Sequence, residues 1–143
     1  MACTVFLLAF AAWTGSLDKS TVTADDLTKP LVVWSGRYPS SGPAPASATW
    51  TTELIGTEEA WIRFWKARRG DEQVPRVDFG RSVVVIATWP GMAADSLHLG
   101  PCGKHRHSVW VGAWEGKIEG VGYVAGMFAR SGIKDVEGQP LPR

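Results

Sequence analysis

The alternation of apolar and polar positions along the chain predicts several short strands separated by turns. β-Branched and aromatic residues, which favour strands, gather in apolar runs that glycine, proline and polar residues interrupt. The run SVVVIATW at 82–89 is apolar almost throughout, which indicates a central strand buried on both faces. The strands expected from these runs are residues 31–34, 49–55, 82–89, 96–99, 108–114 and 117–128.

The connections between these strands carry signals of their own. Residues 36–47 are rich in Gly, Pro and Ser, which predicts a surface loop, after which 49–55 returns as a strand. Glu115 and Gly116 separate the last two runs at the spacing of a tight turn, which favours a hairpin between them. Glycines within the final run indicate bulges or the close approach of another chain segment.

One helix is predicted, over residues 57–69. The Thr57 hydroxyl can accept hydrogen bonds from the first free backbone amides, and acidic residues follow it in the first turn. Trp61, Phe64 and Trp65 are spaced i, i+3 and i+4, so they form one apolar face. Because such a face usually packs inward, we expect these rings to fix the helix to a sheet.

Together these elements predict a mainly β (α+β) fold. Of the 143 residues, 45% are hydrophobic and 20% charged, which is enough apolar surface for the core of one domain. We expect residues 21–143 to form a single β-rich domain, either a single antiparallel sheet or a sandwich-like arrangement, with one amphipathic helix packed on it. Residues 1–20 are set apart as a possible signal peptide or N-terminal apolar segment.

The N-terminal segment contains an apolar stretch, VFLLAFAAW at 5–13, of the length of a secretory h-region. Small residues follow it, as near a cleavage site, although no Lys or Arg precedes it. One interpretation is a signal peptide of an exported protein (periplasmic, envelope or extracellular); the other is a first buried strand or helix of a cytoplasmic one. We expect export, which would remove Cys3 and leave Cys102 as a single thiol.

The charge balance narrows the class of partner. Fifteen Lys and Arg stand against fourteen Asp and Glu, a net charge of +1. This near-neutrality gives no electrostatic reason to bind nucleic acid or an acidic membrane surface. No apolar run reaches the roughly 18 residues that a transmembrane helix requires. We therefore expect neither a nucleic-acid partner nor a transmembrane span.

Residues with metal-ligand chemistry gather in the sequence CGKHRH at 102–107. In a strand, His105 and His107 would point to the same face, within reach of one metal ion. Cys102 and His98 would add two ligands if the turn between them folds back. Nitrogen and sulfur donors suit copper or zinc. The alternative, a basic and solvated hairpin turn that needs no cofactor, is favoured by the positive charges inside the motif.

Eight Trp residues are many for a chain of this length. In the strand at 108–114, strand alternation places Trp110 and Trp114 together on one face, opposite the smaller apolar residues. Exposed Trp rings can stack on sugars or on proline-rich peptides, and Trp50 or Trp34 would extend such a ligand-binding platform. The alternative is that the rings fill a small core, since Trp is highly buried on average.

Sequence motifs for catalysis are missing. No G-x-S-x-G elbow frames a serine, and neither a phosphate loop nor a dinucleotide fingerprint is present. The acidic pair at 58–59 is explained by the start of a helix. We therefore do not expect an enzyme, and nominate no catalytic residue.

The stretch 57–91 resembles a known family. It combines an acidic helix start, Trp61 and Trp65, the element PRVDF at 75–79 and an apolar strand. This pattern is similar to the C-terminal domain of the protease complex subunit PrcB family, and 131–142 is similar to the tail of uncharacterised exported bacterial proteins with this domain. The resemblance implies a small secreted or envelope-associated domain, mostly β with one helix, in a non-catalytic accessory role.

The same stretch has a physical account beside the resemblance. Asp78 can hydrogen-bond nearby amides at the entry of the strand, while Phe79 fills the core. At 92–95 the chain departs from the family, because Met-Ala-Ala-Asp stands in place of a Thr-Gly-Gly-Tyr-like turn. No role of that turn is therefore carried over.

The function that we favour from the sequence is a non-enzymatic, exported accessory or binding module that contacts another protein. The loop at 36–47 and the edges of the sheet are the expected contact surfaces. The alternatives are a copper- or zinc-binding protein built on Cys102, His105 and His107, and a carbohydrate-binding module built on Trp110 and Trp114.

Overall fold

The computed structural model describes residues 28–37, 50–91, 93–101, 106–115 and 120–143. The expected N-terminal segment at 1–20 lies outside the described residues, as does most of the expected loop at 36–47. In chain order, the helices and strands are β1 (Val32–Arg37), β2 (Thr51–Ile55), α1 (Glu58–Arg69), β3 (Ser82–Pro90), β4 (Ala93–Pro101), β5 (Arg106–Glu115), β6 (Val121–Ala129), β7 (Asp135–Val136) and β8 (Gln139–Pro140).

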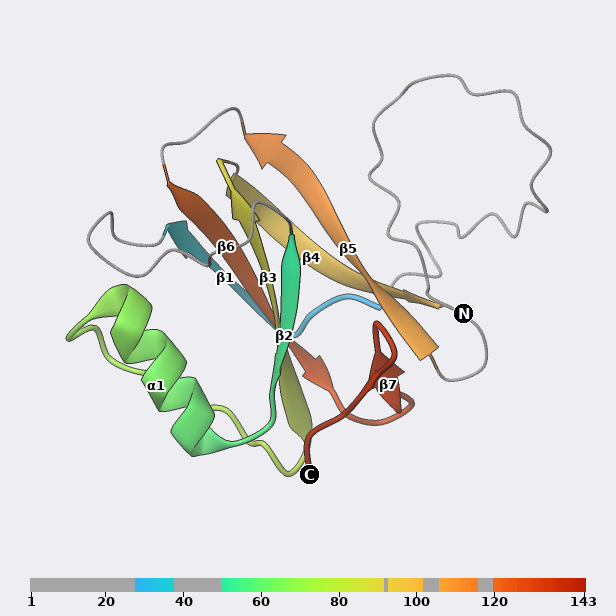
Figure 1. Cartoon of the computed structure of the whole chain (residues 1–143). Helices are drawn as coiled ribbons and strands as arrows, with labels where there is room; N and C mark the ends of the chain where they lie inside the picture. The colour runs from blue at the N-terminus through green and yellow to red at the C-terminus, as the bar shows by residue number, and fades with distance from the viewer. Residues whose placement is uncertain (1–27, 38–49, 92, 102–105, 116–119) are drawn as a thin grey trace, which may run out of the picture.

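The strands form two sheets that pack face to face, and α1 covers the remaining face of one of them (Figure 1). The central sheet has the order β1-β6-β3-β2 and is antiparallel throughout. The outer sheet has the order β4-β5-β7-β8, in which the β5–β7 pair is parallel. The mainly β fold with a packed helix is therefore confirmed, in its sandwich-like form.

Two expected strand arrangements are wrong. The strands β5 and β6 do not form a hairpin, because β5 belongs to the outer sheet and β6 to the central sheet. Nor does β2 return along β1: the two occupy opposite edges of the central sheet, and β2 pairs with β3. The reason lies in β6, which is buried on both faces over 121–126. A strand that is apolar on both faces is stabilised most in the middle of a sheet.

The central sheet has a core on each face. Along β3 the side chains alternate between them: Val83 and Val85 face the outer sheet, whereas Val84 and Ile86 face α1. The buried residues of the inter-sheet core are Val83, Val85, Ala87, Ala94, Leu97, Leu99, Val109, Val124, Phe128, Ile133 and Val136. Those of the helix-side core are Ile55, Trp61, Phe64, Trp65, Val84, Ile86, Tyr123 and Ala125.

The helix α1 begins and ends where the sequence predicts. The Thr57 hydroxyl accepts a hydrogen bond of 3.3 Å from the backbone amide three residues on, and Gly70 follows the helix with a φ of 60°, which favours glycine. Trp61, Phe64 and Trp65 are buried in the helix-side core, so their expected role as anchors is confirmed. In the described part of the chain, no helix has the length and apolar character needed to cross a membrane.

The PRVDF element at 75–79 leads from the helix layer into β3. One carboxylate oxygen of Asp78 accepts a 3.0 Å hydrogen bond from the backbone N–H of Gly80. The backbone carbonyl of Asp78 accepts a 2.8 Å hydrogen bond from the backbone N–H of Ser82. Phe79 packs against the helix-side core. The physical account of Asp78 at the strand entry is therefore confirmed, whereas Phe79 is partly buried and packs against the core instead of filling it.

Candidate functional site

The expected metal ligands are not brought together in the part of the chain that the structure describes. Cys102 and His105 lie outside the described residues. Strand alternation places His107 on the same face of β5 as Val109, toward the inter-sheet core. On β4, the residues on either side of His98 point into that core, so His98 itself points away from it. His98 therefore faces away from His107 and cannot be the fourth ligand. Among the described residues, no three His, Cys, Asp or Glu side chains are grouped to hold a metal ion; a site built on Cys102, His105 and His107 stays a prediction.

Trp110 and Trp114 are the two residues on which a ligand-binding platform was expected, and of these two the structure describes the side chain of Trp110. Its ring is partly buried, and its indole Nε1 donates a 3.0 Å hydrogen bond to the Ser108 hydroxyl on the same face of β5. His98 lies directly across from it on β4. The backbone of Trp114 is placed in β5, but its side chain is outside the described set. A Trp110–Trp114 surface therefore remains a prediction.

Trp34 and Trp50 lie elsewhere and do not extend that surface. The ring of Trp34, on β1, has its centroid 5.1 Å from that of Trp61 and 6.0 Å from that of Trp65. The ring of Trp50 lies 5.7 Å from that of Trp89. Trp34 packs on the helix-side core and Trp50 on the inter-sheet core. Both rings are therefore partly buried and packed against a core.

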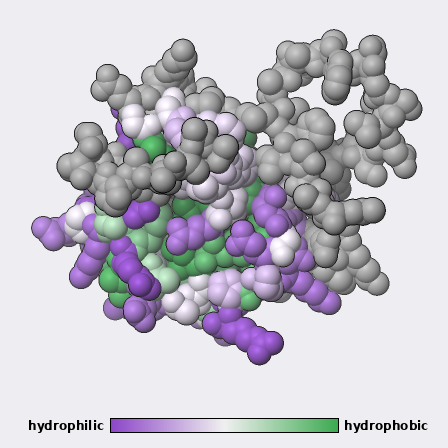
Figure 2. All heavy atoms as spheres, in the orientation of Figure 1, coloured by the Kyte–Doolittle hydropathy of each residue, from purple (hydrophilic) through white to green (hydrophobic). Residues whose placement is uncertain are grey.

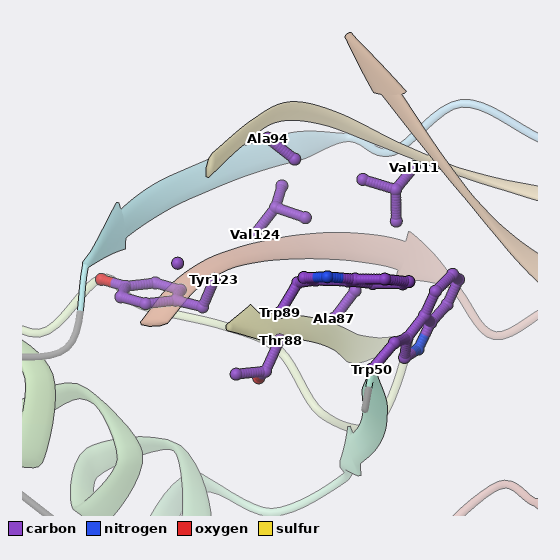
Figure 3. Close-up of a pocket in the computed structure, with 9 residues that line it drawn as sticks. Trp50, Ala87, Thr88, Trp89, Ala94, Val111, Tyr123 and Val124 are labelled. Atoms are coloured by element: carbon purple, nitrogen blue, oxygen red, sulfur yellow. The ribbon is translucent and has the colours of Figure 1, made fainter. Parts of the chain in front are cut away.

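A small pocket lies between the two sheets beside Trp50 and Trp89 (Figure 3). In Figure 3 the Trp89 ring lies beneath Val111 and Val124, and the Trp50 ring stands at an angle beside it. The pocket volume is about 10 Å³, close to the space that one water molecule occupies. It is therefore too small to hold an organic ligand in this conformation.

The most exposed apolar surface belongs to the start of β1. Leu31 is 62% and Val32 40% exposed, and no other large hydrophobic side chain of the described residues is classed as exposed. Just before them, Thr28 forms a bridge to Leu99 of β4. Residues 28–37 thus run from the edge of the outer sheet to the edge of the central sheet, where β1 pairs with β6 alone among the described strands.

The end of α1 is tied to the same edge strand. The Arg69 guanidinium donates hydrogen bonds to the Tyr123 hydroxyl on β6, at 2.8 Å, and to the backbone carbonyl of Ser35 on β1. It also lies over the Trp65 ring, 5.0 Å from its centroid. These contacts hold the second half of β1 against the helix layer.

Glu137 completes the edge of β5, a role that the sequence analysis missed. It adopts a φ of 53°, and Gly138 one of 77°, in the turn between β7 and β8. Its backbone N–H donates to the carbonyl of His107 at 2.8 Å, and its carboxylate accepts from the backbone N–H of Val109 at 2.6 Å. Burial raises the pKa of this carboxyl, and the hydrogen bond from Val109 opposes part of the shift. The available signal was the Glu-Gly pair itself, since tight hairpins favour such residues.

Comparisons with known proteins add no assignment to these features. No family model, no curated protein and no solved structure matches the chain. The resemblance of 57–91 to the PrcB family therefore stays a prediction.

Proposed function

We propose that the chain is a non-enzymatic, exported binding module that contacts another protein through the outer edge of β1. The observation that carries the proposal is the exposure of Leu31 and Val32 at the start of this edge strand. The proposed occupant is an extended segment of the partner protein, which would pair with β1 as a fifth strand of the central sheet.

The chemistry of β1 supports strand addition. Proteins usually protect a sheet edge with charged side chains, proline or a covering segment. Lys29 and Pro30 stand just before Leu31, but β1 itself, VVWSGR, has no proline and no charge before Arg37. Val33 packs on the inter-sheet core and Trp34 on the helix-side core, so the strand is held from both faces. A firmly held edge with exposed apolar residues suits a partner strand, because main-chain hydrogen bonds and side-chain contacts form together.

The test is a site-specific crosslink in the cells that make the protein. A photoreactive residue replaces Leu31, the cells are irradiated, and the adducts are identified by mass spectrometry. We expect one dominant adduct with a different protein, because strand addition places position 31 against the partner. The matched control is the same photoreactive residue at Gln73, which is exposed after α1 and should give no such adduct.

A charge at the edge sharpens this test. In a chain that carries the photoreactive residue at position 32, Leu31→Lys should reduce the adduct strongly, because natural edges use lysine to prevent pairing. An adduct formed only between two copies of this chain would mean that β1 pairs with itself. That result, or the absence of any adduct at both positions, would contradict the proposed protein partner.

Export is the second part of the proposal and has a separate test. The protein purified from its own cells should lack roughly 15–20 N-terminal residues, the length of a signal peptide. A full-length mass in the cytosolic fraction would contradict export and would leave the proposed contact at β1 untouched.

A further inference from the structure

A groove of about 320 Å³ lies between α1 and the extended segment 74–77. This volume falls within the range of small-molecule sites in proteins, and it is far larger than the pocket of about 10 Å³ between the sheets. The groove is on the helix side of the molecule, and the residues that line it do not include Leu31 or Val32.

The floor of the groove is apolar and fixed by the core. The Trp61 side chain is 1% exposed, and its indole Nε1 donates a 2.9 Å hydrogen bond to the backbone carbonyl of Pro75. Val74 and Val77, on either side of this contact, pack against the helix-side core. Ile62, partly buried, supplies an apolar wall from α1. The segment is therefore held against the helix by its own contacts, so a ligand need not create the site.

The rim of the groove has an excess of positive charge. Lys66 and Arg76 line it together with one acidic residue, Glu58, and all three side chains are exposed. The ion pairs found among the described residues use other side chains, so neither cation of the rim is neutralised by one. Figure 2 shows the same mixture at the position of α1, where purple charged side chains stand among green apolar ones.

The helix sets the spacing of these groups. Glu58, Ile62 and Lys66 follow one another at i, i+4 and i+8, so they lie on one face of α1. At 1.5 Å per residue, Glu58 and Lys66 are about 12 Å apart along the helix axis. Along α1 the groove therefore has an acidic end at Glu58, an apolar middle at Ile62 and a basic end at Lys66, while Arg76 follows Pro75 on the opposite wall, beside Trp61.

We propose that this groove binds a small molecule with an apolar body and a single carboxylate. The apolar body would lie on Ile62 and on the Trp61–Pro75 floor, and the carboxylate would reach Lys66 at the basic end of the groove. Glu58 would repel a second carboxylate at the opposite end, which favours monocarboxylates over dicarboxylates.

Octanoate is the probe, and octanol and octylamine are comparison ligands of the same chain length. The full chain is titrated with each by calorimetry, and backbone NMR shifts locate the site. We expect octanoate to bind with a stoichiometry of one, and octanol and octylamine to bind more weakly. The octanoate shifts should concentrate in 58–66 and 74–77.

Charge-removing variants test the recognition of the carboxylate. Lys66→Gln should weaken octanoate binding about two- to fivefold, the size of one exposed charge contact, and leave octanol binding unchanged. Arg76→Gln, on the opposite wall, should weaken it less. Glu58→Gln should leave octanoate binding nearly unchanged, because exposed charges about 12 Å apart are largely screened by salt. Arg63→Gln is the matched control, because it removes a positive charge from the exposed face of α1, outside the groove.

Three results would overturn the proposal, provided that the circular dichroism spectrum of each variant is native. The first is the absence of one-to-one octanoate binding. The second is equal binding of octanoate and octylamine. The third is equal weakening by Arg63→Gln and Lys66→Gln, which would show that net charge alone attracts the probe. None of these results bears on the crosslink at Leu31.

Discussion

The two faces of the central sheet are covered in different ways. On the helix side, α1 contributes three buried aromatic residues, Trp61, Phe64 and Trp65. Trp34 of β1 packs among them. On the other side, the buried residues come from five strands and the turn before β7, and Phe128 is the one aromatic residue of that described set. The remainder are Ala, Val, Leu and Ile.

The difference follows from the shape of the covering element. A helix meets a sheet along one stripe, so few positions must span the gap, and large rings do this. A second sheet faces the first with every second residue of each strand, so small side chains suffice. We therefore expect the stability of the helix layer to depend on a few rings, and that of the two-sheet layer to be spread over many residues.

The largest expected effect is that of Trp61→Ala. Its ring lies 5.2 Å from that of Trp65 and 5.7 Å from that of Phe64, and it also anchors Pro75. Loss of the ring and of this hydrogen bond should lower the free energy of unfolding by about 3–5 kcal/mol. Urea denaturation followed by circular dichroism measures the loss. If Trp61→Ala does not fold, Trp61→Phe is the substitute, because it keeps a ring and loses the hydrogen bond to Pro75. Its free energy of unfolding should lie below that of the wild type by less than the loss expected for Trp61→Ala.

On the other face, Leu99→Ala should cost less than Trp61→Ala. The Leu99 side chain is fully buried in the inter-sheet core, and its truncation should lower the free energy of unfolding by about 2–4 kcal/mol. Neighbours from several strands can move toward the space, which limits the loss. The same urea titration gives the value. A larger loss for Leu99→Ala than for Trp61→Ala would reverse the comparison between the two faces.

The elements on which this comparison depends were predictable where their signal is local. The helix at 57–69 and the strand at 82–89 follow from the spacing of neighbouring residues. The separate placement of β5 and β6 in two sheets was not predictable, because it depends on which strands β6 meets at distant points of the chain. The Glu-Gly turn signal was real at 137–138, where it joins β7 and β8, and misleading at 115–116.

The candidate surfaces were less predictable than the elements. The run LVVW at 31–34 indicated a strand, but one strand does not reveal whether it lies at an edge, so the exposure of Leu31 and Val32 needed the structure. The groove beside α1 depends on Trp61 meeting Pro75, 14 residues away. The spacing of the histidines similarly could not show that His98 and His107 face opposite ways.

The start of α1 offers a smaller test of the helix layer. Thr57→Ala removes the hydroxyl that caps the first turn, so we expect a loss of about 1 kcal/mol in the free energy of unfolding. Thr57→Ser keeps a hydroxyl and should restore most of it. Urea denaturation of the three proteins makes the comparison. Equal losses for the Ala and Ser variants would mean that the methyl group, and not the cap, matters at this position.

The smallest effect is expected at the edge of the outer sheet, where Glu137 takes the place of a strand partner of β5. Burial raises the pKa of Glu137 in the folded protein above its value in the unfolded chain. Between these two pKa values the folded state binds more protons than the unfolded state, so stability falls as the pH rises through this interval. The contribution of Glu137 to the free energy of unfolding is fully present below the pKa of this group in the unfolded chain. It is lost above the pKa of the group in the folded protein. Glu137→Gln keeps an oxygen that can accept from Val109 and has no charge, so this part of the pH dependence should disappear.

Thermal unfolding of both proteins in steps from about pH 4, near the ordinary pKa of Glu, up to neutral pH checks this expectation. The unfolding temperature of the wild type should fall more with rising pH than that of Glu137→Gln, and the variant should be at least as stable at neutral pH. Glu53→Gln, at an exposed position of β2, is the matched control and should follow the wild type. The effect should be smaller than those of the three substitutions above, because the Glu137 carboxylate is only partly buried and water still screens its charge. Identical pH slopes for the wild type and Glu137→Gln would mean that the hydrogen bond from Val109 compensates fully for burial, and that this edge is held equally well by the charged group.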